Sequence, residues 1–95
     1  MAQNTTLTIP PATWTLITDS DVTAATWCNT GPGTLWIKAT TDTTAPTSTA
    51  SAIPYPPGMG ERSSTLLSDL WPGLAGRDRL WAYSDVNGQV TISHA

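Results

Sequence analysis

The chain has 95 residues, of which only 12% are charged, and its net charge is −3. One cysteine excludes an intrachain disulfide, and one histidine leaves too few ligands for a zinc site. Four basic residues cannot form the positive surface that nucleic-acid binding requires. A small domain without disulfide or metal gains added stability chiefly by associating with other subunits.

The first half of the chain predicts short strands separated by turns. Each strand segment either alternates between apolar and polar side chains or is rich in β-branched and aromatic residues, as pleated strands are. Prolines, glycines and short polar side chains break the pattern between the segments and favour turns. The predicted strands are 5–9, 13–18, 25–29 and 34–40.

The middle of the chain has a different composition. Residues 41–52 (TDTTAPTSTASA) have no apolar period and predict a long exposed loop or arm. The three prolines of residues 53–62 (IPYPPGMGER) predict an extended path that ends in a glycine-rich turn. A further strand is expected at 63–67 and a loop at 68–78.

The last sixteen residues, LWAYSDVNGQVTISHA, predict a β-hairpin. Asn87-Gly88 lies between two alternating runs, and both residues suit the positive φ angles of a two-residue type I′ turn. This register places Tyr83 opposite Ile92 and gives both faces of the hairpin apolar side chains. Such a hairpin is expected to contact protein on both sides.

Together these segments predict an all-β fold. No helical pattern of ten residues or more is present, and the strands follow one another at intervals of about 8–12 residues. We expect one domain, residues 1–95, with residues 41–52 as its loop or arm. Its fold is predicted to be a small antiparallel β-sandwich or β-barrel, jelly-roll-like, of seven or eight short strands.

No set of residues predicts catalysis, a metal or a cofactor. His94, the one candidate base, lies one residue before the end of the sequence and is expected to be a polar residue at a strand end. Cys28 stands in an apolar run and is expected to be a small buried hydrophobic residue. Asp19 and Asp21 are better explained by turn chemistry than by a carboxylate pair or a Ca²⁺ site, which needs six or more oxygen ligands. We therefore predict that the protein is not an enzyme.

Five tryptophans are the strongest remaining signal. Trp14, Trp27 and Trp71 are expected in the core, with Trp71 and Leu70 closing one end, because small β-domains rely on aromatic volume. Trp36 stands between two aliphatic residues that are expected to face the core. It should then face outward, and an outward tryptophan typically marks an interface. Exposed tryptophan rings are also typical of carbohydrate-binding modules.

The start of the sequence has neither the basic segment nor the apolar segment of a secretory signal. No apolar run approaches the roughly 18 residues of a membrane span. We expect synthesis in the cytoplasm and no membrane contact.

Several motifs occur in a recognisable order. A Thr-rich first strand is followed by an N-x-G-x-G turn at 29–33 before LWIKA, by Pro57-Gly58 leading to Glu61-Arg62, and by the closing segments RLWAYS and VTIS. This layout resembles, over nearly the whole chain, that of small accessory proteins of tailed-phage virions, the capsid decoration or cement proteins and the base domains of head fibres. The resemblance implies a β-sandwich or β-barrel, usually a trimer, on the outer capsid surface where several major capsid subunits meet. It implies no catalytic residues.

On this basis we predict a virion structural protein that is made in the host cytoplasm, binds the outer surface of the phage head and stabilises it. Its expected partners are the major capsid protein and copies of itself, as a homotrimer. A head-fibre or tail adaptor and a carbohydrate-binding module are the alternatives. The residues expected near subunit or capsid contacts are Trp36, Trp81, Tyr83 and Tyr55.

Overall fold

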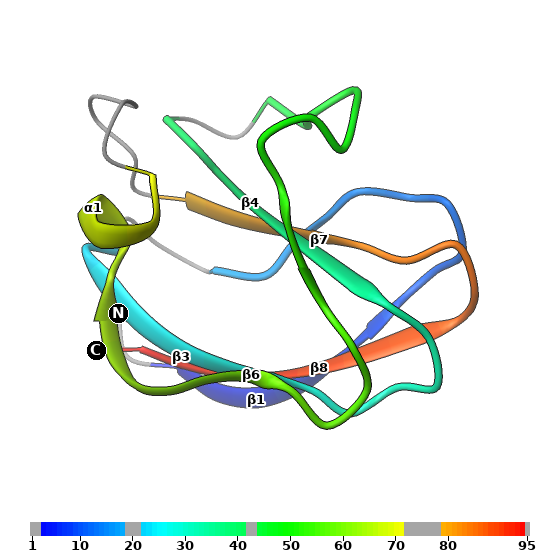
Figure 1. Ribbon diagram of the computed structural model, residues 1–95, viewed down its shortest axis with the longest axis horizontal. Coiled ribbons are helices and arrows are strands. Elements are labelled where there is room, and N and C mark those ends of the chain that lie inside the picture. The colour runs from blue at the N-terminus through cyan, green and yellow to red at the C-terminus, as the bar shows by residue number, and fades with distance from the viewer. Residues whose placement is uncertain (1–2, 19–21, 42–43, 72–78, 95) are drawn as a thin grey trace.

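The computed structural model describes residues 3–18, 22–41, 44–71 and 79–94, with the backbone alone at 3, 62–65, 68 and 69. Within these residues the chain forms eight strands and one helical turn (Figure 1). No helix among them is long and apolar enough to cross a membrane. The elements are β1 (Gln3–Ile9), β2 (Thr15–Leu16), β3 (Ala24–Asn29), β4 (Leu35–Thr40), β5 (Ile53–Tyr55), β6 (Gly60–Leu66), α1 (Leu67–Leu70), β7 (Arg79–Tyr83) and β8 (Gly88–His94).

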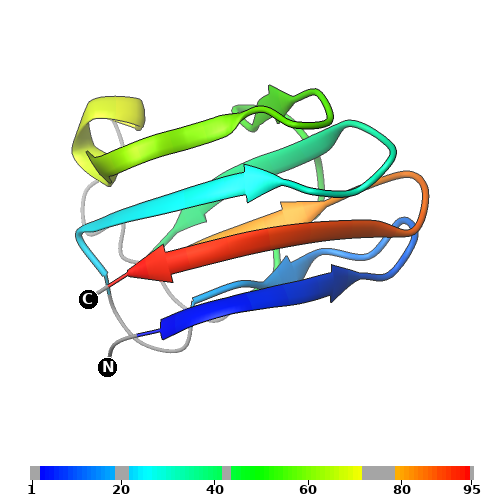
Figure 2. The same cartoon turned by 90° about the horizontal axis from the view of Figure 1, so that it is seen from below.

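The strands form two four-stranded antiparallel sheets that pack face to face (Figure 2). Sheet A has the order β1-β8-β3-β6, and sheet B has the order β2-β7-β4-β5. Among the described strands only β4 and β5 are consecutive in sequence and paired within one sheet. This is the topology of an eight-stranded jelly roll, so the predicted β-sandwich is confirmed. The closed barrel is not formed, since the two sheets remain separate.

The core lies between the two sheets because side chains alternate along each strand. From sheet B, β4 buries Leu35, Ile37 and Ala39, each at most 2% exposed, as the sequence predicts. From sheet A, β8 buries Val90 and Ile92. The same cluster includes further apolar residues of both sheets, of α1 and of the segments next to them: Ile9, Ile17, Val22, Ala25, Trp27, Tyr55, Leu67, Trp71, Leu80 and Ala82.

The predicted hairpin over residues 80–95 is wrong. β7 pairs with β2 and β4 in sheet B, whereas β8 pairs with β1 and β3 in sheet A, so residues 84–87 form an arch between the sheets (Figure 1). Neither Asn87 nor Gly88 has a positive φ angle. Gly88 serves close packing instead, since a Cβ there would lie 3.0 Å from the Cβ of Ser84. The inward side chains of the two strands meet in one core, and the aromatic residues of β7 lie on the outer face of sheet B. The inward residues are Leu80, Ala82, Val90 and Ile92.

Two residues predicted in the core lie on outer faces. Trp14 is half-buried on the outside of sheet B, and Cys28 is half-buried on the outside of sheet A. Cys28 follows the buried Trp27 along β3, and the two-residue period of a strand turns it away from the core. Trp71 is buried, as predicted, and Leu70 packs against the core beside it.

The predicted loop or arm has no strand in its described part, residues 44–52, which is mostly exposed. Hydrogen bonds from β4 and from the residue after α1 hold it to the domain. Lys38 Nζ donates to the Ser48 carbonyl at 3.4 Å, and Trp71 Nε1 donates to the Ser51 carbonyl at 3.0 Å. Asp19 and Asp21, on which the Ca²⁺ alternative rests, lie outside the described residues, as do 42–43 and 72–78.

Candidate interaction surface

The outer face of sheet B carries a row of side chains from β5, β4 and β7 and from the residue just before β2. The register places Trp36 of β4 opposite Tyr83 of β7 on one side and opposite Pro54 of β5 on the other. Trp14, next to β2, packs against Tyr83 with ring centroids 5.2 Å apart. The three rings are half-buried and Pro54 is exposed. We call Trp14, Tyr83, Trp36 and Pro54 the aromatic row.

The aromatic row follows from strand geometry and offers an apolar contact surface. Residues directly opposite on neighbouring strands have Cβ atoms about 5 Å apart, which brings their side chains close enough to pack against one another. None of the four side chains carries a charge, and an uncharged surface costs less free energy to dehydrate than a charged one. Tryptophan and tyrosine are also the residue types enriched at the centres of protein interfaces.

Trp81 lies on the same outer face but is only 6% exposed. Leu16 of β2 and Lys38 of β4 stand directly opposite it on its two sides. Its Nε1 donates a hydrogen bond to Thr40 Oγ1 at 2.8 Å. The indole of Trp81 therefore joins β7 to β4 and leaves little surface for a partner.

Of the four residues predicted near contacts, the structure brings Trp36 and Tyr83 together in the aromatic row. Tyr55 belongs to the core and is 7% exposed, so it packs within its own chain, as Trp81 does. Sequence reasoning missed Trp14 and Pro54. A strict two-residue period through TWTLIT would have placed Trp14 on the outer face, opposite to the buried Ile17.

Tyr55 connects the two sheets at the side where β5 and β6 form their edges. Its hydroxyl donates to Glu61 Oε2 at 2.9 Å, and its ring meets Trp27 edge-on with centroids 6.0 Å apart. Burial raises the pKa of Tyr55, and the hydrogen bond to Glu61 and the charge of that carboxylate raise it further. These causes all disfavour a buried phenolate beside a carboxylate.

We expect the free energy of unfolding to fall as the pH rises above about 10, where the tyrosines of the unfolded chain ionise. Folded Tyr55 keeps its proton to higher pH, so the unfolded state releases more protons and base favours unfolding. Tyr83, whose pKa is raised by desolvation and by Asp85, acts with the same sign. Urea unfolding between pH 8 and 11 measures the slope, which Tyr55→Phe should reduce. A Tyr55→Phe variant with the wild-type slope would contradict this assignment.

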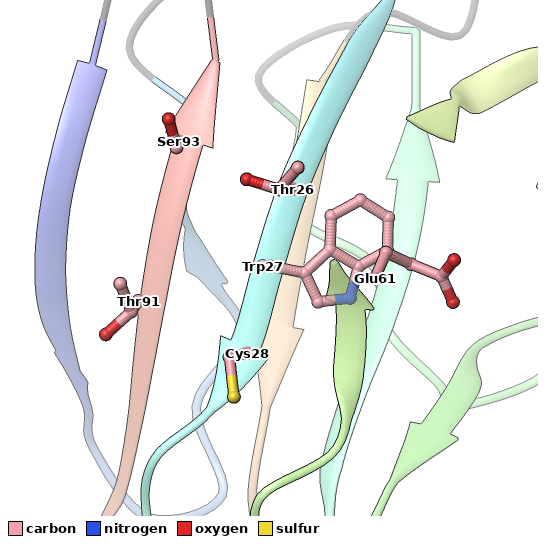
Figure 3. Close-up of a pocket in the computed structure, with 6 residues that line it drawn as sticks. All are labelled: Thr26, Trp27, Cys28, Glu61, Thr91 and Ser93. Atoms are coloured by element: carbon pink, nitrogen blue, oxygen red, sulfur yellow. The ribbon is translucent and has the colours of Figure 1, made fainter. Parts of the chain in front are cut away.

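The outer face of sheet A carries polar, uncharged side chains on β1 and β8. The hydroxyl oxygens of Thr6 on β1 and Thr91 on β8 are 3.0 Å apart, and Ser93 hydrogen-bonds Asn4 in the same way across the two strands. A shallow pocket of about 270 Å³ opens on this face (Figure 3). Its lining residues are Thr26, Trp27, Cys28, Glu61, Thr91 and Ser93.

Four polar side chains of this pocket are already engaged within the chain, whereas the buried Trp27 Nε1 has no hydrogen-bond partner. Thr91 and Ser93 bond to β1, Glu61 accepts the Tyr55 hydroxyl, and the Cys28 thiol donates to the Asn29 carbonyl at 3.8 Å. The part of the chain that the structure describes holds no cluster of three His, Cys, Asp or Glu side chains. His94 is buried at the last position of β8, a polar residue at a strand end, as predicted.

Comparison of the chain with known protein families, with curated proteins and with solved structures finds no match.

Proposed function

We propose that the protein is a structural protein of a phage virion, a decoration protein that binds the outer surface of the head through the aromatic row. The observation that carries this proposal is the row itself, a strip of uncharged and mostly aromatic side chains on the outer face of sheet B. The resemblance of the sequence layout supports it, and so does the jelly-roll fold, which recurs in viral capsid proteins. Fold alone does not assign function, so the proposal depends mainly on the aromatic row.

In this arrangement the outer face of sheet B contacts protein and the outer face of sheet A contacts water. The aromatic row of sheet B contacts the major capsid protein, while the hydroxyl-rich face of sheet A remains hydrated. A standard interface buries about 800 Å² per partner. That is about one sixth of the 4836 Å² surface of the domain, an area that one sheet face can supply. Copies bound side by side then reinforce the shell by joining neighbouring capsid subunits.

A carbohydrate-binding module is the second candidate, since jelly rolls also occur in lectins. The geometry of the row favours protein docking over sugar stacking. The ring centroids of Trp14 and Tyr83 are 5.2 Å apart and the ring planes are tilted by 42° to each other, so the two rings do not form one flat platform on which a sugar ring could stack. A head-fibre or tail adaptor would use the same row and differ only in its target.

Co-sedimentation of the purified protein with phage heads, and separately with tails, tests the proposal. The wild-type protein should bind heads saturably and should not bind tails. Binding to tails alone would assign the adaptor role, and binding to neither would overturn the proposal. A glycan array covers the sugar-binding alternative, for which we expect no signal.

The Trp36→Ser variant should bind heads at least tenfold more weakly, because a central interface tryptophan contributes about 2 kcal/mol or more. Met59→Ser is the matched control, since Met59 is 54% exposed and lies outside the aromatic row. Its affinity should stay within twofold of wild type. Circular dichroism and thermal unfolding confirm that both variants are folded. Equal losses in the two variants would contradict docking through the aromatic row.

Light scattering measures the mass of the free protein, for which the resemblance implies a trimer. Assembly as a homo-oligomer is part of the proposal, whether it occurs in solution or only on the shell. A protein that stays monomeric both in solution and on heads would contradict it.

A further inference from the structure

The free edges of the two sheets differ in how well they are protected against pairing with a strand of another chain. Among the described strands, four form the edges and have a neighbouring strand on one side only: β1 and β6 in sheet A, and β2 and β5 in sheet B. An edge presents unpaired backbone N–H and C=O groups that can pair with another chain. Soluble proteins protect their edges with very short strands, prolines, charges or bulges.

Three of the four edges carry such protection. β2 has only two residues, and β5 has Pro54, which lacks a backbone N–H, at its centre. β6 begins with Gly60-Glu61-Arg62, so it holds two charged residues. Its pairing with β3 is also irregular, because the register shifts between Ala25 and Trp27.

β1, the dark blue strand at the bottom of Figure 2, has none of these features. Its sequence, QNTTLTI, has no charge, proline or glycine, and all seven residues pair in regular register with β8. Within the described residues no strand pairs with its other side. Leu7 of this strand packs against the core but is only half-buried.

We propose that β1 pairs with β1 of a second copy of this chain, antiparallel and centred on Thr6. Of the antiparallel registers, this one pairs all seven residues. It also keeps each side chain on its own face, with Asn4 opposite the partner's Thr8 and Thr5 opposite the partner's Leu7. The two copies of sheet A then form one continuous sheet, and the half-buried Leu7 gains cover.

A second copy fits this edge better than a different partner does. An uncharged strand offers no charge to select a charged peptide. In the register above, however, each outward residue of β1 lies opposite an outward residue of the second copy, and each inward residue lies opposite an inward one. The contact is two-fold symmetric and closes at a dimer, because the remaining edges are protected. It therefore differs from the trimer that the resemblance implies. The inference does not depend on the proposed function, since the aromatic row lies on the face of sheet B.

Analytical ultracentrifugation over a range of protein concentrations tests the pairing. The wild-type protein should show a monomer–dimer equilibrium that dissociates on dilution, because a single strand pair buries less than a standard interface. Thr6→Lys places two like charges directly opposite each other and should weaken the dimer at least tenfold. Thr91→Lys is the matched control, because it adds the same charge to the same sheet face and removes the same Thr6–Thr91 hydroxyl pair. Its dimer affinity should stay within twofold of wild type.

Disulfide trapping tests the register in a Cys28→Ser background. Directly opposite residues have Cα atoms about 5 Å apart, which suits a disulfide, so Thr6→Cys should form cross-linked dimers at least tenfold faster than Thr8→Cys. The two Thr8 residues would lie about 14 Å apart in this register. A wild-type protein that stays monomeric at millimolar concentration would overturn the inference. The inference would also be overturned by a trimer that does not cross-link through position 6. Equal trapping at positions 6 and 8, or equal weakening of the dimer by the two lysine variants, would contradict it as well.

Discussion

Replacing Asn29 by aspartate should lower the free energy of unfolding by about 3–5 kcal/mol. Asn29 ends β3, is 1% exposed, and its amide nitrogen donates to the carbonyls of Gly33 at 2.7 Å and Tyr55 at 2.8 Å. Its amide oxygen accepts from the backbone N–H of Gly31 at 3.0 Å. One side chain thus joins the turn before β4 to the end of β5, in the opposite sheet.

The aspartate removes both donated bonds and turns a carboxylate toward two carbonyl oxygens. A buried carboxylate in such a place has a raised pKa, so part of the lost stability should return as the pH falls toward about 4, below which the carboxyl is protonated in both states. Asn87→Asp is the matched control, since Asn87 is exposed, and it should change stability by less than about 0.5 kcal/mol. Urea unfolding at pH 7 and pH 3.5 measures both variants. An Asn29→Asp protein within 1 kcal/mol of wild type at pH 7 would contradict this role.

Gly60→Ala should destabilise the domain by about 3 kcal/mol, as overpacking against rigid backbone does. Gly60 begins β6 opposite Cys28 of β3. A Cβ at this position would overlap the Trp27 carbonyl oxygen and lie 2.7 Å from the Cα of Cys28. Both contacts are to backbone, which cannot rotate aside, so the two strands would have to separate.

Gly58→Ala is the matched control for Gly60→Ala. No atom lies within 4 Å of a Cβ at Gly58, but its φ of +82° is strained for alanine. This substitution should cost only about 1 kcal/mol, the difference between glycine and alanine in left-handed backbone. Urea unfolding of both variants separates steric overlap from backbone strain. Equal destabilisation by the two variants would show that the close approach of β6 to β3 does not limit stability.

A strand could be predicted from the sequence wherever every second side chain along it is buried in the core. The segment LWIKAT shows this, because Leu35, Ile37 and Ala39 alternate with polar or aromatic residues and are all buried. Alternation does not say which strand is the neighbour. Asn87-Gly88 therefore predicts a hairpin locally, while the burial of Val90 and Leu80 on opposite sides of one core requires an arch between the sheets.

The candidate surface could be predicted only in part for the same reason. Trp36 faces outward because its neighbours along the strand face inward, and that is a local property. The meeting of Trp14, Tyr83, Trp36 and Pro54 depends on the order β2-β7-β4-β5, which joins segments far apart in the chain. Composition alone did not separate Tyr55 and Trp81, which pack within their own chain, from the aromatics of the row.

The most direct test of capsid docking is an electron cryo-microscopy reconstruction of phage heads saturated with the protein. We predict density for the jelly roll on the outer surface of the shell, where major capsid subunits meet. Sheet B should face the shell, with Trp36 and Tyr83 within about 4 Å of the capsid protein. Heads without this density, or with the aromatic row turned to solvent, would contradict docking through this face.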